Sequence, residues 1–184
     1  MKINKQIAKK LSAYGLGAAL VLAGAGTVSE FEGKSNKAYL DPVKIATICY
    51  GETKQVRLGD YKTDDECYES LAEDLLAHDK ILMSVVKVPM TDYQHAAFLS
   101  FLYNVGPGKK GVKDGFVQLK KTGGPSTMLR KLNSGDYEGA CNEFLNWMQQ
   151  GQAMAGIEKR RRAEMAVCKG DFSDEVKNQK AKPN

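Results

Sequence analysis

The strongest feature of the hydrophobic pattern is a run of 19 residues without a charge, from Leu11 to Ser29. Four lysines lie within the ten residues that precede it. A helix of this length would span about 28 Å, close to the thickness of the hydrocarbon core of a bilayer. Nine of the 19 residues are glycine or alanine, so the sequence predicts a helix that inserts only weakly. The lysines predict a cytoplasmic N-terminus, with everything after Ser29 outside the membrane.

The same segment also has features of a cleavable secretory signal. Ala23-Gly24-Ala25 has the A-x-A form of a cleavage site, and the apolar region is only slightly long for a signal peptide. A soluble helix rich in alanine and glycine is a third interpretation, which the flanking lysines disfavour. Retention and cleavage both remain open at this point, and both predict that the rest of the chain is exported.

After this segment the pattern predicts a small β-hairpin over residues 37–51. Asp41 and Pro42 occupy the first two positions of an expected type I turn. Residues 45–50 then carry alternating β-branched side chains, as in a strand, and the pattern ends at Gly51.

The remainder of the chain has the pattern of a helical body. Capping boxes at Thr63 and Thr91 open two amphipathic helices, and Gly106-Pro107 ends the second. Three more helices are expected: one with Met128 and Leu132, one with Ala140 to Trp147, and one from Gly156 to Cys168. We therefore expect an α+β fold. Its parts are a basic N-terminal segment with the apolar helix (residues 1–29), one folded domain (residues 30–169) and a polar tail (residues 170–184).

The composition fits one globular domain with short extensions. The chain has 184 residues, of which 42% are hydrophobic and 27% charged, and its net charge is +5. Four basic and no acidic residues precede the apolar run, so the net positive charge reports on membrane topology more than on a nucleic-acid surface. No zinc-finger spacing or RNP-type aromatic motif is present, and we expect a monomer without a nucleic-acid partner.

Four cysteines, Cys49, Cys67, Cys141 and Cys168, all follow the apolar segment. In an exported chain an even set favours two disulfides over four thiols. Three pairings are possible, and we favour Cys49–Cys67 with Cys141–Cys168 because each joins neighbouring elements. Four reduced cysteines in a cytosolic protein are the alternative.

Several further sequence patterns give little evidence of a functional site. Residues 106–111 match G-x-G-x-x-G, but they follow a helix rather than a strand, so a helix-terminating loop fits better than a dinucleotide site. His78 and His95 lie in expected helices without a metal-ligand pattern, and we expect no metal or cofactor. The run Arg160–Arg162 is typical of a solvated helix face, although one of the three is a candidate for contact with anionic substrate groups.

Glu32, Asp41 and Thr47 form the candidate catalytic set, with the spacing E-x8-D-x5-T. Hydrolysis of a glycosidic bond needs one protonated carboxyl that donates to the leaving oxygen, and one ionised carboxylate across the scissile bond. Glu32 follows an apolar helix and Phe31, surroundings that would favour its protonated form. Asp41, in a hydrated turn, would stay ionised, and Thr47 supplies a hydroxyl to orient a water. Each residue also has a structural interpretation, so the spacing alone leaves catalysis undecided.

These residues open a series of motifs that resembles one family. Glu32-Gly33 with Asp41, and residues 47–51, are similar to the catalytic E-G…D pattern and the T-I-G-Y-G strand of the phage-type lysozymes of glycoside hydrolase family 24. The resemblance covers residues 30–168, with the motifs in the right order. The further matching residues are Thr91-Asp92, Gln94, Ala96-Ala97, Ser100-Phe101, Tyr103-Asn104-Val105-Gly106, Leu129 to Asn133, Gly135 to Tyr137, Trp147, Gly156-Ile157, Arg160-Arg161 and Glu164.

The resemblance implies a lysozyme-like fold with a small N-terminal hairpin subdomain and a mostly helical body. It implies hydrolysis of the β-1,4 bonds between N-acetylmuramic acid and N-acetylglucosamine in peptidoglycan, with Glu32, Asp41 and Thr47 as the catalytic set. Cys49 stands where many relatives have glycine, which fits the disulfide interpretation. Glu52 stands where many have histidine, so any role of that histidine has no counterpart here.

The glycine- and alanine-rich front end resembles the signal-anchor-release (SAR) segment of a subset of these endolysins. This implies an enzyme held inactive at the host inner membrane through residues 11–29, which lyses the host from the periplasm after release. No cysteine precedes Cys49, so thiol exchange from the anchor is not available and refolding of the released segment is the expected control. A lytic transglycosylase acting on the same bond, and a cell-wall-binding protein without catalysis, are the alternatives.

Overall fold

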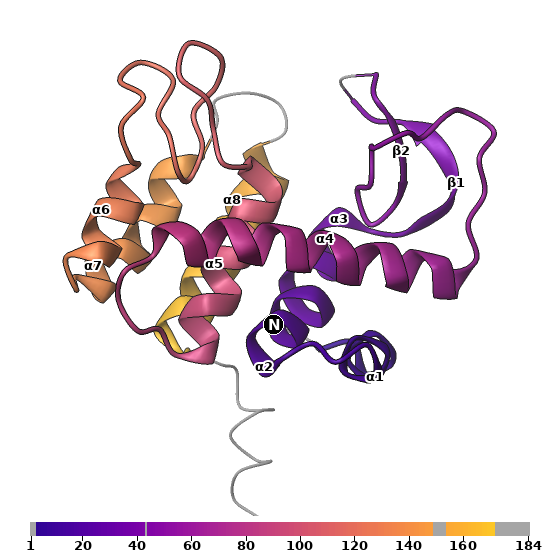
Figure 1. Ribbon diagram of the computed structural model, residues 1–184, viewed down its shortest axis with the longest axis horizontal. Helices are drawn as coiled ribbons and strands as arrows, with labels where there is room; N and C mark the ends of the chain where they lie inside the picture. Colours follow the sequence, from indigo (N-terminus) through magenta and orange to yellow (C-terminus); the bar gives the residue numbers. More distant parts are fainter. Residues whose placement is uncertain (1–2, 43, 149–153, 172–184) are drawn as a thin grey trace, which may run out of the picture.

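The computed structural model describes residues 3–42, 44–148 and 154–171. A two-stranded sheet with its loops lies on one side, most helices pack on the other, and the long helix α4 connects the two (Figure 1). The N-terminal elements are α1 (Lys5–Ala13), α2 (Ala18–Leu22), the π-helix η1 (Ala23–Val28), α3 (Ser29–Glu32), β1 (Ser35–Leu40) and β2 (Ala46–Cys49). The body consists of α4 (Asp64–Val85), α5 (Asp92–Val105), α6 (Thr127–Asn133), α7 (Tyr137–Asn142), the 3₁₀-helix η2 (Glu143–Trp147) and α8 (Met154–Lys169). This is the α+β arrangement that the sequence predicts.

The N-terminal apolar segment is broken into short helices. α1 ends before Gly15, which takes a positive φ of 80°, and α2 begins only at Ala18. The structure therefore does not contain the single helix that the sequence predicts over residues 11–29. Glycine enters the left-handed region at little cost because it lacks a Cβ, so a sequence rich in glycine accepts this break. Among the described residues, no helix is both long and apolar enough to cross a membrane.

The segment forms part of the core instead. All six residues of η1 are buried, and both η1 and α2 lie against α5. The packing is tightest at Gly24, where a Cβ would lie 2.5 Å from Leu11 Cδ1 and 2.7 Å from Leu75 Cδ1. Ala23 and Ala25 are fully buried beside it. The small residues from which the sequence predicts a weakly inserting helix thus let this backbone pack close to α1 and α4.

Polar contacts lie at both ends of α1. The Asn4 side chain caps the helix, and the Asn4 backbone donates to the Ala25 carbonyl at 2.8 Å. Lys10 pairs with Asp65, at the start of α4, at 2.5 Å. Both side chains of that pair are exposed, so it contributes little. The buried apolar face of α1 is the main source of its stability in this position.

β1 and β2 form the expected antiparallel hairpin, with Tyr39 opposite Thr47. In the connection, the Asp41 carbonyl accepts from the Lys44 N–H at 2.9 Å, as in a β-turn. Val43, within this turn, lies outside the described residues. The polar tail expected from residue 170 also lies outside them from residue 172 onward.

Two disulfides crosslink the chain from β2 onward. Cys49–Cys67 joins β2 to α4, and Cys141–Cys168 joins α7 to α8. This is the pairing that the sequence favours, because each bond connects neighbouring elements.

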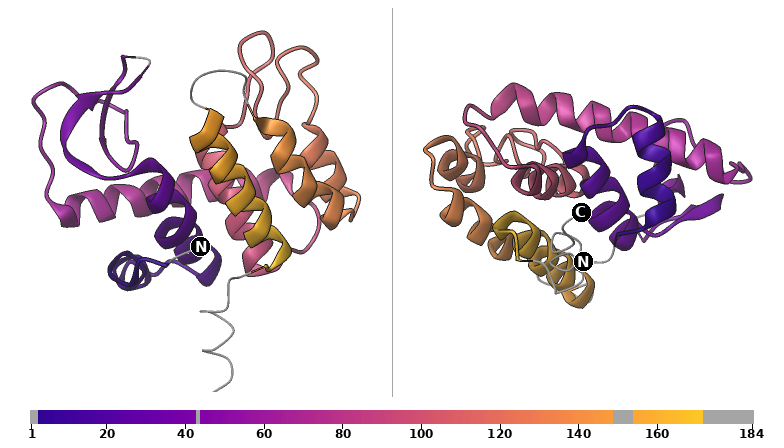
Figure 2. Two further views of the ribbon diagram at one scale, coloured as in Figure 1. Left: turned by 180° about the vertical axis from the view of Figure 1, so that it is seen from behind. Right: turned by 90° about the horizontal axis from the view of Figure 1, so that it is seen from below.

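The helical body begins at the expected capping boxes, whose first residues are Thr63 and Thr91. α8 lies along α5, as the view from behind shows (Figure 2). Four aromatic rings meet at the centre of the body: Phe98, Phe101, Phe116 and Phe144. α5 is therefore the central helix, in contact with the N-terminal segment on one side and α8 on another.

Between α5 and α6, residues 106–126 form an irregular double loop that projects from the body (Figure 1). Gly106 ends α5 with a φ of 75°, which confirms the helix-terminating loop. Two backbone stretches meet at the base of the loop, since a Cβ on Gly115 would lie 2.1 Å from the Gly108 nitrogen. Phe116 is fully buried, whereas the lysines of the loop are exposed. The loop is thus anchored at its base and basic along its length.

We expect Gly24→Leu to lower the free energy of unfolding by about 1–3 kcal/mol, because leucine overfills the contact with Leu11 and Leu75. In a chain of this size the melting temperature should fall by about 2–12 °C, measured by circular dichroism. Gly17→Leu is the matched control, since no atom lies within 4 Å of a Cβ at that position. Equal losses in the two variants would contradict tight packing at Gly24.

Candidate active site

Glu32 lies at the junction between the N-terminal segment and the hairpin. It is the last residue of α3, and Gly33 follows with a φ of 70° and turns the chain toward β1. The carboxylate approaches Gly51, just beyond β2, where a Cβ would lie 3.3 Å from Glu32 Oε2. The Glu32 side chain is 20% exposed. It therefore reaches solvent at the base of the hairpin.

Arg160 of α8 holds the Glu32 carboxylate. Its Nη1 donates to Glu32 Oε1 at 2.6 Å, across 128 positions of sequence. The Arg160 side chain is only 5% exposed, and its guanidinium lies 5.7 Å from the centre of the Phe31 ring. The purely apolar surroundings expected for Glu32 are thus not present, because a buried guanidinium lies against it. This contact fixes the orientation of the carboxyl group.

Arg160 belongs to a buried network built around Glu164. Glu164 Oε1 accepts from Arg160 Nε at 3.0 Å and from Ser100 Oγ at 2.8 Å, and Oε2 accepts from Arg161 Nη1. Glu164 is fully buried. In the part of the chain that the structure describes, every buried side-chain nitrogen or oxygen has a hydrogen-bond partner. Two guanidiniums and a hydroxyl therefore offset the cost of removing Glu164 from water.

Arg161 completes the network on the side away from Glu32. Its Nη2 donates to Asn104 Oδ1, its Nε donates to the Trp147 carbonyl at 3.4 Å, and its guanidinium lies 4.7 Å from the Phe101 ring centre. Burial lowers the pKa of Arg161, and the neighbouring Glu164 carboxylate opposes that shift. Its three donor groups are fixed by contacts from two different helices and η2.

The prediction that these arginines lie on a solvated helix face is wrong for Arg160 and Arg161, which are buried. It holds for Arg162, which pairs with Glu158 at the surface. A signal for the network was nevertheless present in the sequence. Two arginines with a glutamate three and four positions later lie on adjacent turns of a helix, where they can pair. A hydropathy pattern alone predicts that such charged side chains are exposed to solvent.

A tyrosine ties the body to the hairpin beside Glu32. The Tyr103 hydroxyl, on α5, donates to the Tyr50 carbonyl at 2.9 Å. Burial raises the pKa of Tyr103 above its usual range, so the hydroxyl stays protonated and remains a donor. Because Tyr50 precedes Gly51, this bond fixes the backbone that faces the Glu32 carboxylate.

Asp41 and Thr47 are both bonded to Ile45. Asp41 Oδ1 accepts from the Ile45 N–H at 2.8 Å, and Thr47 Oγ1 donates to the Ile45 carbonyl at 3.1 Å. Thr47 is 4% exposed, whereas Asp41 is partly exposed. The structure therefore holds these two candidates at the turn end of the hairpin, while Glu32 approaches the hairpin at Gly51.

Other polar residues make structural contacts. Glu52 pairs with Lys62 at 2.7 Å. His95 pairs with Asp79, and the His78 ring packs against Tyr103 with centroids 5.0 Å apart. Within the described ranges, no three residues among His, Cys, Asp and Glu are grouped in a way that can hold a metal ion.

We expect Arg160→Met to lower the free energy of unfolding by about 3–5 kcal/mol, because it leaves the buried Glu164 with one guanidinium fewer. The melting temperature should fall by about 6–20 °C, as followed by circular dichroism. Arg162→Met removes the same charge from an exposed pair and should change stability by less than about 1 kcal/mol. If both variants were as stable as the unmodified protein, the network would not hold the site together.

Comparisons with known proteins identify the family and the fold. Residues 29–164 match the phage lysozyme family. The chain is 33% identical over 153 residues to the SAR-endolysin of bacteriophage PS119, covering 82% of this chain and 84% of the relative. A crystal structure of a mutant of P22 lysozyme is 28% identical, with a TM-score of 0.61 and coverage of 91% and 97%. The active form of the P1 phage endolysin has the same fold, with a TM-score of 0.74 at 19% identity over 95% of this chain and 99% of its own.

The family expected from the sequence motifs is thereby confirmed, and the fold is lysozyme-like. The matched region contains Glu32, Arg160 and Glu164 and both strands of the hairpin. The chain belongs to the phage lysozyme family and is a peptidoglycan-degrading glycoside hydrolase of the muramidase class.

Proposed function

We propose that Glu32, Asp41 and Thr47 hydrolyse the β-1,4 bond between N-acetylmuramic acid and N-acetylglucosamine. The observation that carries this proposal is the contact between Glu32 and Arg160, in which a buried guanidinium holds a partly exposed carboxyl at 2.6 Å beside the hairpin. Arg160 binds Oε1, so Oε2 is the oxygen that carries the transferable proton. As the general acid, Glu32 donates this proton to the leaving sugar oxygen while the bond to the anomeric carbon breaks.

Asp41 supplies the second carboxylate. Its Oδ1 is held by the Ile45 N–H, and its negative charge stabilises the positive charge that develops on the sugar ring. Thr47 gives its hydroxyl proton to the Ile45 carbonyl, so its oxygen is left to accept a hydrogen bond from the attacking water. The water oxygen adds to the anomeric carbon and gives one proton to the Asp41 carboxylate, which produces a new reducing end.

We expect Glu32→Gln to slow the clearing of permeabilised Gram-negative cells by about 10²–10⁴-fold, because the amide has no acidic proton to donate. Glu30→Gln is the matched control, since it removes a carboxylate two residues away that pairs with Lys159 at 3.6 Å. This control should clear cells at the rate of the unmodified protein, and both variants should keep its circular dichroism spectrum.

Three results would overturn this assignment. Equal clearing by Glu32→Gln and the unmodified protein would remove Glu32 from the catalytic set. Products with anhydro-sugar ends, identified by mass, would indicate a lytic transglycosylase. Binding of peptidoglycan without any new reducing ends would indicate a wall-binding protein.

We further propose that residues 11–29 first lie in the host inner membrane and fold onto the body only after release into the periplasm. Glu32 follows η1 and α3 directly, and η1 packs against α5 and α8. The contact with Arg160 therefore requires the preceding segment to be docked. When residues 11–29 cross the bilayer, Glu32 is held within a few residues of its surface and the site is incomplete. Similarity to the SAR-endolysin of PS119 supports this order of events.

The membrane potential supplies the control. In the anchored form four lysines and the N-terminal amine lie on the cytoplasmic side. Moving these five unit charges outward costs about 11 kcal/mol per 100 mV, at about 2.3 kcal/mol for each charge. Collapse of the potential removes this cost, and a weakly inserted helix then leaves the membrane.

We expect an uncoupler to move full-length protein from the membrane fraction to the soluble fraction, as followed by blotting and intact mass. Lys5→Gln with Lys9→Gln removes two of the charges, lowers the opposing free energy by about 5 kcal/mol per 100 mV, and should permit release at a smaller depolarisation. Lys80→Gln with Lys87→Gln makes the same charge change at two exposed positions of the body and should leave the release threshold unchanged.

Continued membrane retention of uncleaved protein after the potential has collapsed would contradict release. A soluble product that begins after Ala25 would instead assign the segment to a cleaved secretory signal.

A further inference from the structure

Cys49 has a backbone conformation that residues with a side chain rarely adopt. It is the last residue of β2, and its φ is 56°, in the left-handed region. A Cβ is disfavoured in this region, whereas glycine enters it at little cost. Such a conformation persists only where the surrounding structure imposes it. The hydrolytic step proposed above does not involve Cys49.

The tight turn that follows Cys49 faces the Glu32 carboxyl. Across this turn Ile48 and Glu52 exchange two backbone hydrogen bonds, of 2.9 and 3.0 Å. Gly51 lies within the turn, and a Cβ there would be 3.3 Å from Glu32 Oε2 and 3.7 Å from Glu32 Cδ. The Glu32 carboxyl thus lies directly against this backbone, and a displacement of the turn changes the surroundings of Oε2.

An ion pair holds the far end of the turn. Lys62 Nζ donates to Glu52 Oε1 at 2.9 Å and to Glu52 Oε2 at 2.7 Å. The same ammonium group donates to Ser70 Oγ, on α4, at 2.8 Å. The Glu52 side chain is therefore tied to α4 through Lys62, but this contact acts three residues beyond Cys49.

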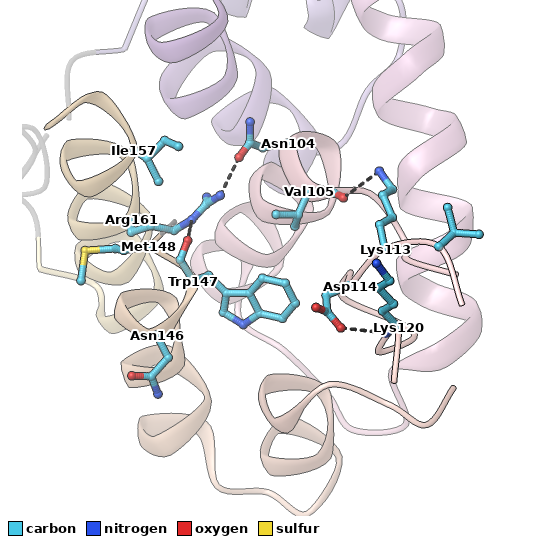
Figure 3. A pocket seen from close by; sticks show the side chains of 11 residues that line it. Asn104, Val105, Lys113, Asp114, Lys120, Asn146, Trp147, Met148, Ile157 and Arg161 are labelled. Carbon is cyan, nitrogen blue, oxygen red and sulfur yellow. Dashed lines mark hydrogen bonds between the residues drawn. The ribbon is translucent and has the colours of Figure 1, made fainter. Parts of the chain in front are cut away.

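A hydrogen bond from α5 holds the middle of the turn. The Tyr103 hydroxyl donates to the Tyr50 carbonyl at 2.9 Å. The next residue of α5, Asn104, accepts from Arg161 of α8, as Figure 3 shows. The end of α5 that carries Tyr103 is thus itself fixed. This contact also acts on a residue that follows Cys49 and does not act on the φ of Cys49.

The disulfide acts on Cys49 itself. It joins Cys49 to Cys67, with the two Cα atoms 5.0 Å apart. Cys67 is fully buried in the first turn of α4, a helix of 22 residues that begins at the capping box of Thr63. A disulfide forms only when the two Cα–Cβ bonds point toward each other. Because φ and ψ set the direction of the Cα–Cβ bond, a crosslink to this buried partner restricts φ at Cys49.

We propose that Cys49 is a positioning residue for Glu32, and that its crosslink to Cys67 holds it in the left-handed region. The inference rests on the proposed function, in which Glu32 is the general acid. While the crosslink is present, the turn keeps Gly51 against the Glu32 carboxyl. Without it, Cys49 relaxes to a negative φ, the turn shifts, and the acid is misplaced relative to the leaving oxygen. Glycine at this position needs no crosslink, because it has no Cβ.

Two double variants separate the conformation of residue 49 from the crosslink. Cys49→Ala/Cys67→Ala removes the disulfide and keeps a Cβ, whereas Cys49→Gly/Cys67→Ala removes both. Release of reducing ends from purified peptidoglycan by the full-length protein, over a range of substrate concentrations, gives kcat and KM. We expect the alanine variant to lose about 10–10²-fold in kcat, with KM changed by less than about twofold. The glycine variant should keep kcat within about twofold of the unmodified protein.

Cys141→Ala/Cys168→Ala is the control for the loss of a disulfide as such, because that crosslink joins α7 to α8. It should leave kcat and KM unchanged below its melting temperature. Hydrogen exchange at the amides of Ile48 and Glu52, followed by NMR, reports opening of the turn without catalysis. Exchange should be faster in the alanine variant than in the glycine variant.

Reduction with dithiothreitol makes the same test in protein that has already folded, should the alanine variant fail to fold. In the Cys141→Ala/Cys168→Ala background, Cys49–Cys67 is the remaining disulfide, because the chain has four cysteines. Its reduction should lower kcat by the same factor, and reoxidation should restore it.

The inference is wrong if the alanine variant is as active as the unmodified protein, because the turn then needs no crosslink. Equal losses in the alanine and glycine variants would also contradict it, since they would assign the effect to the link with α4 and not to the φ of Cys49. A higher KM at unchanged kcat would indicate a contact with substrate, which again excludes a positioning role.

Failure of the proposed function gives a different result. In that case the unmodified protein releases no reducing ends, or Glu32→Gln is as active as the unmodified protein. Amide exchange at Ile48 and Glu52 would still show whether the crosslink holds the turn.

Discussion

The site depends on the Arg160 guanidinium, which binds two carboxylates, those of Glu32 and Glu164. Arg160 is buried, and a buried charge persists only where other charges and hydrogen bonds replace water. Glu164 meets part of this requirement and is itself fixed by Ser100 and Arg161. Arg160 therefore cannot follow Glu32 if the N-terminal segment moves away. Assembly of the site requires Glu32 to come to Arg160, and this makes the position of the first 32 residues decisive.

The helix α5 connects the hydrogen-bond network of Arg160 to the rest of the molecule. Residues on successive turns of the helix contact the network, the hairpin and the aromatic core: Ser100, Phe101, Tyr103 and Asn104. The same helix supports η1 on another side. The positions of the N-terminal segment and of the hairpin thus both depend on contacts with α5.

Local signals made much of this fold predictable from sequence. The capping boxes at Thr63 and Thr91, the turn at Asp41 and the pairing of the cysteines each depend on residues close in sequence or on neighbouring elements. The break at Gly15 and the burial of Arg160 were not predicted, because both depend on partners far along the chain. A run of glycine and alanine is compatible with one long helix or with several short ones, and only its contacts with α4 and α5 decide between them. The spacing predicts Glu32 as a catalytic residue, but it does not predict that Arg160 holds the Glu32 carboxylate.

The two disulfides have a consequence for the order of assembly. Both crosslinks, Cys49–Cys67 and Cys141–Cys168, lie entirely after the first strand. Apart from the main chain, no covalent bond ties residues 3–32 to the body, since all four cysteines are paired elsewhere. Oxidative folding of the body and docking of its front end are therefore independent steps. The four cysteines can thus pair before residues 3–32 take their place on the body, because neither crosslink includes this segment.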